Sequence, residues 1–391
     1  MSEKIWFVVQ RYGLEVNGGA ELLCRLFAEK MLKFYPEIEV LTSKAIDYMS
    51  WKNEYKSDFE NINGVSVRRF AVVHERTDDF HKINAEFMNG TMASDREMEW
   101  IEKQGPFCPD LIEYLKIHQQ EYRIIVFFTY LYYPTVVGIK NISQKSIVMP
   151  FAHDEPFLKM KVFDDVFKKP NGIVYGTSEE KDLINSKYNN EDLKSCFGGS
   201  GVDLPQSIDA NRFKAKFNLQ NYLIYVGRID EAKNCKQLFD YFLEYKKRNQ
   251  SNLKLVLMGK PVMQVPKSND IISLGFVSDE DKFDGIKGAI SLVLPSKFES
   301  LSMVVLEAMA VRTPVMVYGE CEVLKGHCKK SNGAFYYNDY FEFEGELNYL
   351  MENPEIVEKM KDNALAYVNE NYSWNKITER FHNLIEEICG E

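Results

Sequence analysis

The 391-residue chain has no apolar run that approaches the roughly 18 residues needed to cross a membrane as a helix. After Met1-Ser2-Glu3-Lys4 it enters a short apolar stretch at once. That stretch is too short for a secretion signal, and no small-residue cleavage site follows it. We therefore expect a cytoplasmic protein.

Cysteine is scarce as well: there are seven, an odd number, scattered along the chain. This pattern is typical of reduced thiols in a cytosolic protein and excludes a disulfide framework. One alternative is a metal site, and no second paired cluster supports it. Its ligands would be Glu320, Cys321, His327 and Cys328.

An excess of positive charge is also missing, because 48 lysines and arginines face 58 acidic residues, for a net charge of −10. Phosphate backbones are bound by basic surfaces, so we expect no nucleic acid partner. The 45% apolar and 27% charged residues are ordinary for a soluble globular protein. The length predicts two or three domains.

Short β-branched or aromatic runs alternate with helical stretches along the whole chain. Continuous apolar strands between helices predict parallel sheets covered on both faces, and about six units in each half predict two doubly wound α/β domains. The predicted strands are 5–10, 39–43, 65–70, 124–128, 146–152 and 172–177, then 222–228, 253–259, 271–277, 289–296, 313–319 and 333–337.

The Gly-rich break Gly198-Gly199-Ser200-Gly201 marks the boundary between the halves. We predict domains at 1–200 and 201–372, and a separate final segment at 373–391. Stretches 47–63 and 74–104 are expected to be irregular, the second with helical patches near 95–103. The final helix is amphipathic, and its apolar face consists of Ile377, Phe381, Leu384, Ile385 and Ile388.

Two glutamates, Glu299 and Glu307, stand eight positions apart in a predicted strand, turn and helix. Small residues in the turn leave the first helical amides free to face an anion. Eight helical residues rise about 12 Å, which would place one carboxylate at the helix start and the other two turns deeper. This suits a nucleotide diphosphate carrying a sugar. The alternative is one solvated glutamate and one in a local salt bridge.

Three other features carry candidate chemistry. Gly18 and Gly19 precede a helix, where backbone amides can approach an anion, although Gly-Gly is also a common way to enter a helix. Arg228 and Lys233 follow a strand and could neutralise a diphosphate; alternatively they pair with neighbouring acids at the surface. His153 closes another strand and could position a substrate or serve as a structural histidine.

In this order the motifs resemble the retaining nucleotide-sugar glycosyltransferases of the GT-B fold, family 4, over nearly the whole chain. The resemblance implies two Rossmann-like domains facing across a cleft. The acceptor would bind the N-terminal domain and the donor the C-terminal one, and a last helix from Trp374 would cross back to the N-terminal domain. The matching motifs are Gly18-Gly19-Ala20-Glu21, His153-Asp154, Gly227-Arg228 with Lys233, Gly199-Ser200-Gly201-Val202-Asp203, and Phe298-Glu299-Ser300 through Leu306-Glu307-Ala308-Met309.

The resemblance also implies roles for single residues. Glu307 would bind the ribose hydroxyls. Arg228 and Lys233 would stabilise the leaving diphosphate, with Gly18 and Gly19 close by, and His153 would lie against the transferred sugar. Glu299 would contact the donor sugar and diphosphate together with the amides of Ser300, Leu301, Ser302 and Met303. The turn departs from the family where many relatives carry a glycine, and Gly259-Lys260-Pro261 replaces the usual acidic or Gly-rich turn.

By the same resemblance the enzyme would be a metal-independent hexosyltransferase that retains anomeric configuration. It would need no cofactor, since the nucleotide sugar is a substrate. The acidic pairs Asp78-Asp79 and Asp164-Asp165 have the wrong spacing for the metal-dependent class. The acceptor would be a glycan or lipid-linked saccharide in surface polysaccharide biosynthesis. The alternatives are a nucleotide-sugar epimerase of the same fold and a non-catalytic nucleotide-sugar-binding protein.

Two segments bear on the acceptor. The lysine-flanked apolar stretch 157–169 would suit peripheral contact with the inner face of a membrane; the alternative is a core-facing helix with solvated lysines. The aromatic stretch 127–133 would stack sugars or form strand core.

Overall fold

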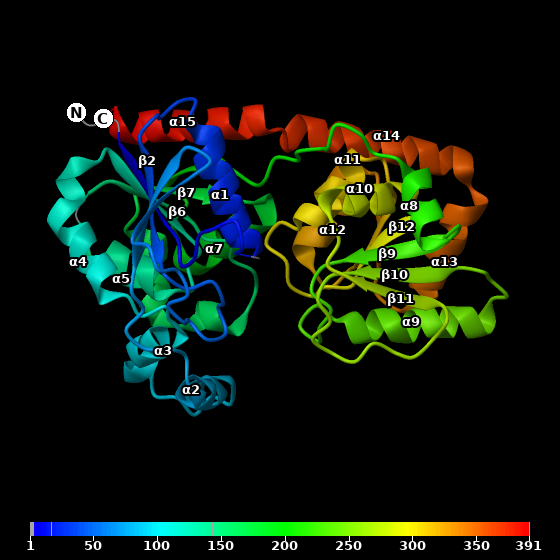
Figure 1. Cartoon of the computed structure of the whole chain (residues 1–391), viewed down its shortest axis with the longest axis horizontal. Coiled ribbons are helices and arrows are strands. Elements are labelled where there is room, and N and C mark those ends of the chain that lie inside the picture. Colours follow the sequence, from blue (N-terminus) through cyan, green and yellow to red (C-terminus); the bar gives the residue numbers. More distant parts are fainter. Residues whose placement is uncertain (1–3, 17, 143, 391) are drawn as a thin grey trace. The chain divides into compact units, whose positions relative to one another are not determined.

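The computed structural model describes residues 4–16, 18–142 and 144–390. The chain folds into two compact units, shown in Figure 1. The first unit combines Met1–Gly199 with Asn375–Glu391, and the second is Ser200–Trp374.

The sheet of the first unit has eight strands in the order β3-β4-β2-β1-β5-β6-β7-β8. All neighbours pair in parallel except β3 and β4, which are antiparallel. The strands are β1 Ile5–Val8, β2 Ile38–Ser43, β3 Phe59–Ile62, β4 Val65–Phe70, β5 Ile124–Phe128, β6 Ser146–Met149, β7 Gly172–Tyr175 and β8 Lys194–Phe197.

The helices of the first unit fill most of the connections between these strands. They are α1 Gly19–Met31, α2 Asp78–Met88, α3 Glu97–Gln104, α4 Pro109–His118, α5 Tyr133–Asn141, α6 Asp164–Lys168, α7 Ser178–Tyr188 and α15 Trp374–Cys389, with single 3₁₀ turns at Ser94–Arg96, Gln119–Glu121, Pro156–Lys159 and Lys161–Phe163.

The sheet of the second unit is fully parallel, in the order β11-β10-β9-β12-β13-β14. Its strands are β9 Tyr222–Val226, β10 Lys254–Met258, β11 Ile271–Gly275, β12 Ser291–Leu294, β13 Val315–Tyr318 and β14 Phe335–Tyr337. Its helices are α8 Ala210–Phe217, α9 Cys235–Arg248, α10 Asp279–Gly288, α11 Met303–Ala310, α12 Glu322–Ser331, α13 Tyr340–Glu352 and α14 Pro354–Asn371.

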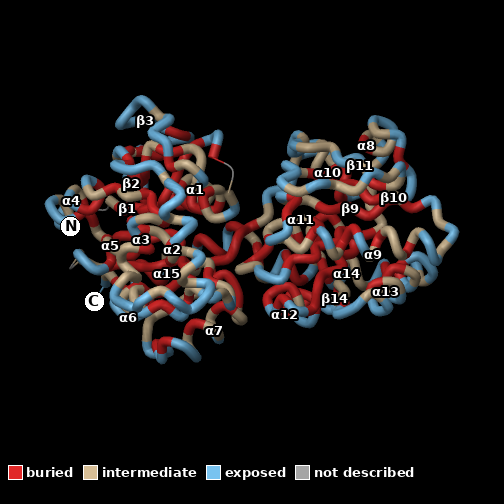
Figure 2. The backbone as a smooth tube through the Cα atoms, turned by 90° about the horizontal axis from the view of Figure 1, so that it is seen from below, coloured by how far each residue is buried: buried red, intermediate tan, exposed pale blue. Residues whose placement is uncertain are grey.

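The predicted fold class, two doubly wound α/β domains with parallel sheets, is confirmed. Every residue of the central strands β1, β5 and β12 is buried, as expected for a sheet with both faces covered. Figure 2 shows this as buried backbone inside each unit. The physical cause is the continuous run of branched and aromatic side chains, which leaves no polar face toward water.

Two strands and one helix were not predicted. Strand β3 is mostly exposed, so its sequence lacks a buried apolar pattern (Figure 2). A signal was nevertheless present, because Asn63-Gly64 follows β3 directly and both residues have positive φ angles, 51° and 89°. An Asn-Gly pair with positive φ at both residues is typical of the two-residue turn that joins the strands of a β-hairpin. Strand β8 is half-buried at the sheet edge, and α2 lies in the stretch expected to be irregular.

The stretch 157–169 forms two 3₁₀ turns and the short helix α6. Leu158, Met160, Phe163, Val166 and Phe167 are all buried in the first unit. The segment therefore packs as core and does not offer the apolar face on which the membrane hypothesis depended. Among the described helices, none combines the length and apolarity required to cross a bilayer.

The aromatic stretch 127–133 is also mainly core, since Phe127, Phe128, Tyr130 and Tyr133 are buried. Helix α15 buries the apolar face predicted for it and lies beside α1, where the rings of Phe381 and Phe27 meet edge to face at 5.5 Å (Figure 1). Arg123 binds Glu386 of α15 through two hydrogen bonds of 2.9 and 2.7 Å. The last helix is therefore part of the first unit's core.

Candidate functional site

In the second sheet the strand order changes direction between β9 and β12. Strands β10 and β11 continue on one side of this pair, and β13 and β14 on the other. Ligands of open α/β sheets bind beyond the carboxyl ends of the strands at such a switch point, because the two following connections diverge there. The loops after β9 and β12 hold Arg228, Lys233 and Glu299.

The loop after β9 is fixed by its own polar groups. Gly227 has a φ of 152°, and a Cβ placed on Gly259 would lie 2.0 Å from the Gly227 carbonyl oxygen. Both glycines thus allow two backbones to meet closely. Arg228 forms an ion pair with Asp230 through Nε, and the backbone amide of Lys233 donates to Asp230 at 2.8 Å. Arg228 therefore makes the ion pair with a neighbouring acid that the sequence offered as the alternative to binding a diphosphate.

Lys233 pairs with a different partner from those considered in the sequence. Its Nζ lies 2.7 Å from Glu299 Oε1, with side-chain exposures of 32% and 14%. The structure thus brings together two motifs 66 positions apart in the chain. The predicted nearness of Arg228, Lys233 and Glu299 at one sheet edge follows from the adjacency of β9 and β12.

The geometry predicted for the two glutamates needs correction. Helix α11 begins only at Met303, so Glu299 precedes the helix and Glu307 lies in its second turn. Ser302 has a φ of 66°, outside the right-handed helical region, so no continuous helix joins the two carboxylates. No side chain caps α11, which leaves its first amides without the partner that a cap would supply.

Glu307 lies on α11 opposite helix α10. Lys282 of α10 donates to Glu307 Oε1 at 2.9 Å, and both side chains are largely buried, at 21% and 14% exposure. Burial raises the pKa of Glu307, and the charge of Lys282 opposes that shift. Lys282 was not among the residues predicted from the sequence. Its distance of 25 positions from Glu307 carries no signal without the tertiary contact.

His327 of α12 binds the turn before α11. His327 is fully buried, and its Nε2 donates to the Leu301 carbonyl at 2.7 Å. Its Nδ1 lies 2.9 Å from the Tyr367 hydroxyl. Both ring nitrogens thus have hydrogen-bond partners within the protein, which supports a structural role and not the metal ligand considered above.

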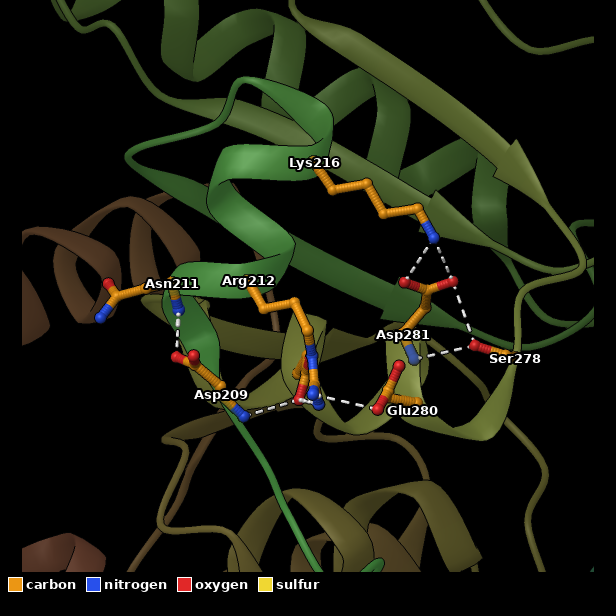
Figure 3. Close-up of polar contacts among 8 residues, drawn as sticks. Asp209, Asn211, Arg212, Lys216, Ser278, Glu280 and Asp281 are labelled. Atoms are coloured by element: carbon orange, nitrogen blue, oxygen red, sulfur yellow. Dashed lines mark hydrogen bonds and ion pairs between the residues drawn. The ribbon is translucent and has the colours of Figure 1, made fainter.

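One acidic motif was overlooked in the sequence: Asp279-Glu280-Asp281 is an Asp-x-Asp triplet. Figure 3 shows its surroundings in the first turn of α10. Both oxygens of Asp281 lie 2.8 Å from Lys216 Nζ, and Glu280 pairs with Arg212 at 3.0 Å. These contacts tie α10 to α8. In the described residues no cluster of three or more His, Cys, Asp or Glu side chains is arranged to hold a metal ion.

In the first unit the Gly18-Gly19 motif caps α1. A Cβ on Gly18 would lie 2.1 Å from Glu21 Oε2, whereas Gly19 faces open space. Glu21 is buried and accepts hydrogen bonds at 2.9 Å from Arg11 Nε and Gln10 Nε2. The space at Gly18 is therefore set by a buried ion pair.

His153 follows β6 in the first unit. Its Nε2 lies 3.8 Å from Glu155 Oε1, and the same oxygen accepts a hydrogen bond from the Tyr130 hydroxyl. Burial raises the pKa of Glu155. Beneath this loop the buried Glu180 accepts amide hydrogen bonds at 2.6 Å from Ala152 and Gly176, and burial raises its pKa to about 8. The loop that carries His153 is therefore firmly held.

Comparison with known proteins bears on both units. Residues 207–366 match the family described as glycosyl transferases group 1. An uncharacterized glycosyltransferase of Methanocaldococcus jannaschii is 24% identical over 415 positions, which cover 97% of this chain and 97% of that protein.

The fold is shared with solved structures over the whole chain. Sucrose-phosphate synthase from Thermosynechococcus elongatus superposes with a TM-score of 0.72 at 14% identity, covering 99% of both chains. The Anabaena protein HepE in complex with UDP-glucose gives a TM-score of 0.71 at 14% identity, covering 98% of this chain and 99% of that one.

The fold is therefore GT-B. The family match in the second unit and the full-length relative together support a glycosyltransferase of this fold.

Proposed function

We propose that this protein is a retaining, metal-independent glycosyltransferase that moves a hexose from a nucleotide-diphosphate sugar to a glycan or lipid-linked acceptor in surface polysaccharide biosynthesis. The second unit would bind the donor and the first unit the acceptor. One observation carries the proposal: Lys233, in the loop that also holds Arg228, pairs with Glu299 at the switch point of a sheet whose domain matches glycosyl transferases group 1. That HepE was solved with UDP-glucose supports a nucleotide-sugar donor.

The chemistry follows from the charges at this edge. The positive charge of Lys233 is balanced by Glu299, and that of Arg228 by Asp230. A diphosphate with its two or more negative charges would compete for both cations, and the uncapped start of α11 adds amides that favour an anion. Glu299, released from Lys233, would then accept hydrogen bonds from sugar hydroxyls.

Stabilisation of the leaving diphosphate is the main demand on the protein. When the glycosidic bond of the donor breaks, negative charge grows on the diphosphate oxygen, where Lys233 and Arg228 are available. The diphosphate itself would take the proton of the acceptor hydroxyl as the new bond forms on the same face. Glu307 would hold the ribose, so that the sugar lies in a reproducible position.

The test is donor-dependent transfer by two variants, assayed with EDTA because the proposed reaction needs no metal. Lys233→Ala and Glu307→Ala should each lower turnover, Lys233→Ala by about 10²–10³-fold, as for the loss of one preorganised charge-stabilising group. Lys236→Ala is the matched control, because Lys236 is 63% exposed on helix α9, which follows the Lys233 loop, and pairs locally with Asp240. Unchanged turnover in both test variants would contradict the site.

The donor is identified by a thermal-shift screen of UDP, GDP and ADP sugars. A ligand at a hundredfold its dissociation constant stabilises the protein by about 2.7 kcal/mol, which such a screen detects. The anomeric configuration of the product, read by NMR, tests retention. An isomerised free nucleotide sugar would instead indicate an epimerase, and binding without any conversion would indicate a non-catalytic binding protein.

A further inference from the structure

We propose that Lys282 is a positioning residue for the nucleotide ribose: it holds the Glu307 carboxylate in the charge state and orientation that accept the ribose hydroxyls. This inference rests on the proposed function, in which Glu307 binds the ribose. Lys282 itself would make no contact with the nucleotide. It would set nucleotide affinity only through Glu307.

Lys282 has two acidic neighbours, of which Glu307 is the buried one. Lys282 Nζ lies 2.9 Å from Glu307 Oε1 and 3.5 Å from Asp279 Oδ1. The two partners differ sharply in exposure, since the Glu307 side chain is 14% exposed and that of Asp279 is 89% exposed. The contact with Glu307 is therefore the shielded one, where a single charge has the larger effect. Lys282 binds one oxygen of the Glu307 carboxylate, Oε1. The same ion pair therefore also fixes the direction of the second oxygen, Oε2.

The charge state of Glu307 decides how many ribose hydroxyls it can accept hydrogen bonds from. A carboxylate accepts hydrogen bonds at both oxygens, whereas a protonated carboxyl presents one of them as a donor. A ribose offers two adjacent hydroxyls, and the ionised form alone accepts from both while Lys282 is in place. Burial acts against this ionised form at Glu307. The positive charge of Lys282 acts in its favour.

Lys282 projects from a helix that is firmly held. Helix α10 is tied to α8 by ion pairs on a different set of residues (Figure 3). Lys216 binds Asp281 through both oxygens, and Arg212 pairs with Glu280 and with the buried Asp284. These contacts fix α10, and with it the backbone from which Lys282 reaches α11. A lysine on a mobile loop would not orient its partner in this way.

The experiment measures nucleotide affinity by calorimetry for the full-length protein with two kinds of probe. UDP, GDP and ADP are compared with their 2′,3′-dideoxy counterparts, which lack both ribose hydroxyls. For the wild type, the nucleotide that binds should bind about tenfold to a hundredfold more tightly than its dideoxy form, the range for hydrogen bonds to a charged group. This first ratio tests the proposed ribose contact itself.

Lys282→Met should lower that ratio toward one by weakening only the hydroxyl-bearing nucleotide. Lys282→Arg should keep most of the ratio, because it retains the charge. In a Glu307→Gln background, Lys282→Met should have no further effect. Lys247→Met is the matched control, since it removes an exposed ion pair of α9 that does not hold α10 and should leave the ratio unchanged.

Equal weakening of the nucleotide and its dideoxy form by Lys282→Met would overturn the inference, because Lys282 would then contact the nucleotide directly or act only on folding. A wild-type ratio of one would instead contradict ribose binding by Glu307. If Lys282→Met does not fold, Lys282→Gln replaces it, and an unchanged ratio in that variant would equally overturn the inference.

Discussion

At the scale of single residues, the two glutamates of the second unit differ because their neighbours differ. Glu299 lies in a turn and pairs with Lys233, a cation that also has access to water. Glu307 lies on a helix and pairs with Lys282 in a more enclosed place. Burial raises the pKa of Glu307, and the charge of Lys282 opposes that shift. The sequence predicted the strand, turn and helix that carry the two glutamates, but not these partners.

Nucleotide binding should depend on pH through Glu307. The ionised carboxylate is the binding form, and its pKa is raised, so affinity is lost as the pH falls through that raised value. The loss should therefore occur at a higher pH than for an ordinary glutamate. Lys282 and Asp279 are the charged groups that act on Glu307, and Lys282→Met should move the loss to still higher pH.

The measurement is the ratio of nucleotide to dideoxynucleotide affinity across the acid range. Taking the ratio removes the titration of the diphosphate, which both probes share. A ratio that does not change with pH would contradict the role of the ionised carboxylate.

His327 should contribute to stability through the turn before α11. His327→Phe keeps a ring in the buried site but removes the donor to the Leu301 carbonyl. We expect the free energy of unfolding to fall by about 1–3 kcal/mol, the cost of leaving a buried polar group unpaired. Chemical denaturation measures this. Tyr372→Phe, which removes only a hydroxyl 3.2 Å from that of Tyr367, should cost less.

At the scale of elements, strand–turn–helix units place charged groups at the sheet edges, and helices also carry groups that the site does not use. Glu346 of α13 is one of these. Its Oε2 is buried without a hydrogen-bond partner among the described residues. Burial, reinforced by the charge of Glu342, raises its pKa to about 8.

Glu346→Gln should change how stability depends on pH. In the folded protein Glu346 holds its proton up to about pH 8, whereas in the unfolded chain it loses the proton near its ordinary value of 4.5. The folded state thus binds more protons between these values, so this group lowers stability as pH rises through the window. The glutamine variant lacks that loss.

Denaturation midpoints at the two ends of the window provide the measurement. The variant and the wild type should agree at the acid end, and the variant should be the more stable at the alkaline end. Equal midpoints at both ends would show that Glu346 does not hold its proton in the folded protein. Glu352→Gln, at an exposed position at the end of the same helix, is the control.

At the scale of the whole molecule, the chain builds its first unit from two distant stretches. Helix α15 follows the entire second unit in the sequence, yet its apolar face completes the first unit's core. Phe381 contacts Phe7 and Phe27 from strand β1 and helix α1. The first unit therefore acquires its full core only when the last residues of the chain are present.

Phe381→Ala should consequently destabilise the first unit by about 3–5 kcal/mol, as for other buried phenylalanines. Hydrogen exchange resolved by segment measures it: amides of β1 and β5 should exchange faster, and those of β9 and β12 should not. Glu379→Ala, an exposed position on the same helix, is the control. Equal acceleration in both units would contradict the assignment of α15 to the first.

The sequence by itself determined the features that depend on local patterns. Short β-branched and aromatic runs identified twelve of the strands, and the central ones are apolar along their length because both their faces are buried. The face of α15 followed from helical periodicity, and the glycine and charged motifs located the strand ends. Sequence patterns did not predict β3, whose exposed residues form no apolar run. They also did not predict β8, a half-buried edge strand.

Only the tertiary structure decided which charges meet. The pairs Lys233–Glu299 and Lys282–Glu307 join residues 66 and 25 positions apart, and the bond from His327 to Leu301 spans 26. Such contacts depend on the order of strands in the sheet and on the packing of helices beside it. A charged residue in the sequence shows neither its partner nor its burial, and these two quantities set its pKa and its chemistry.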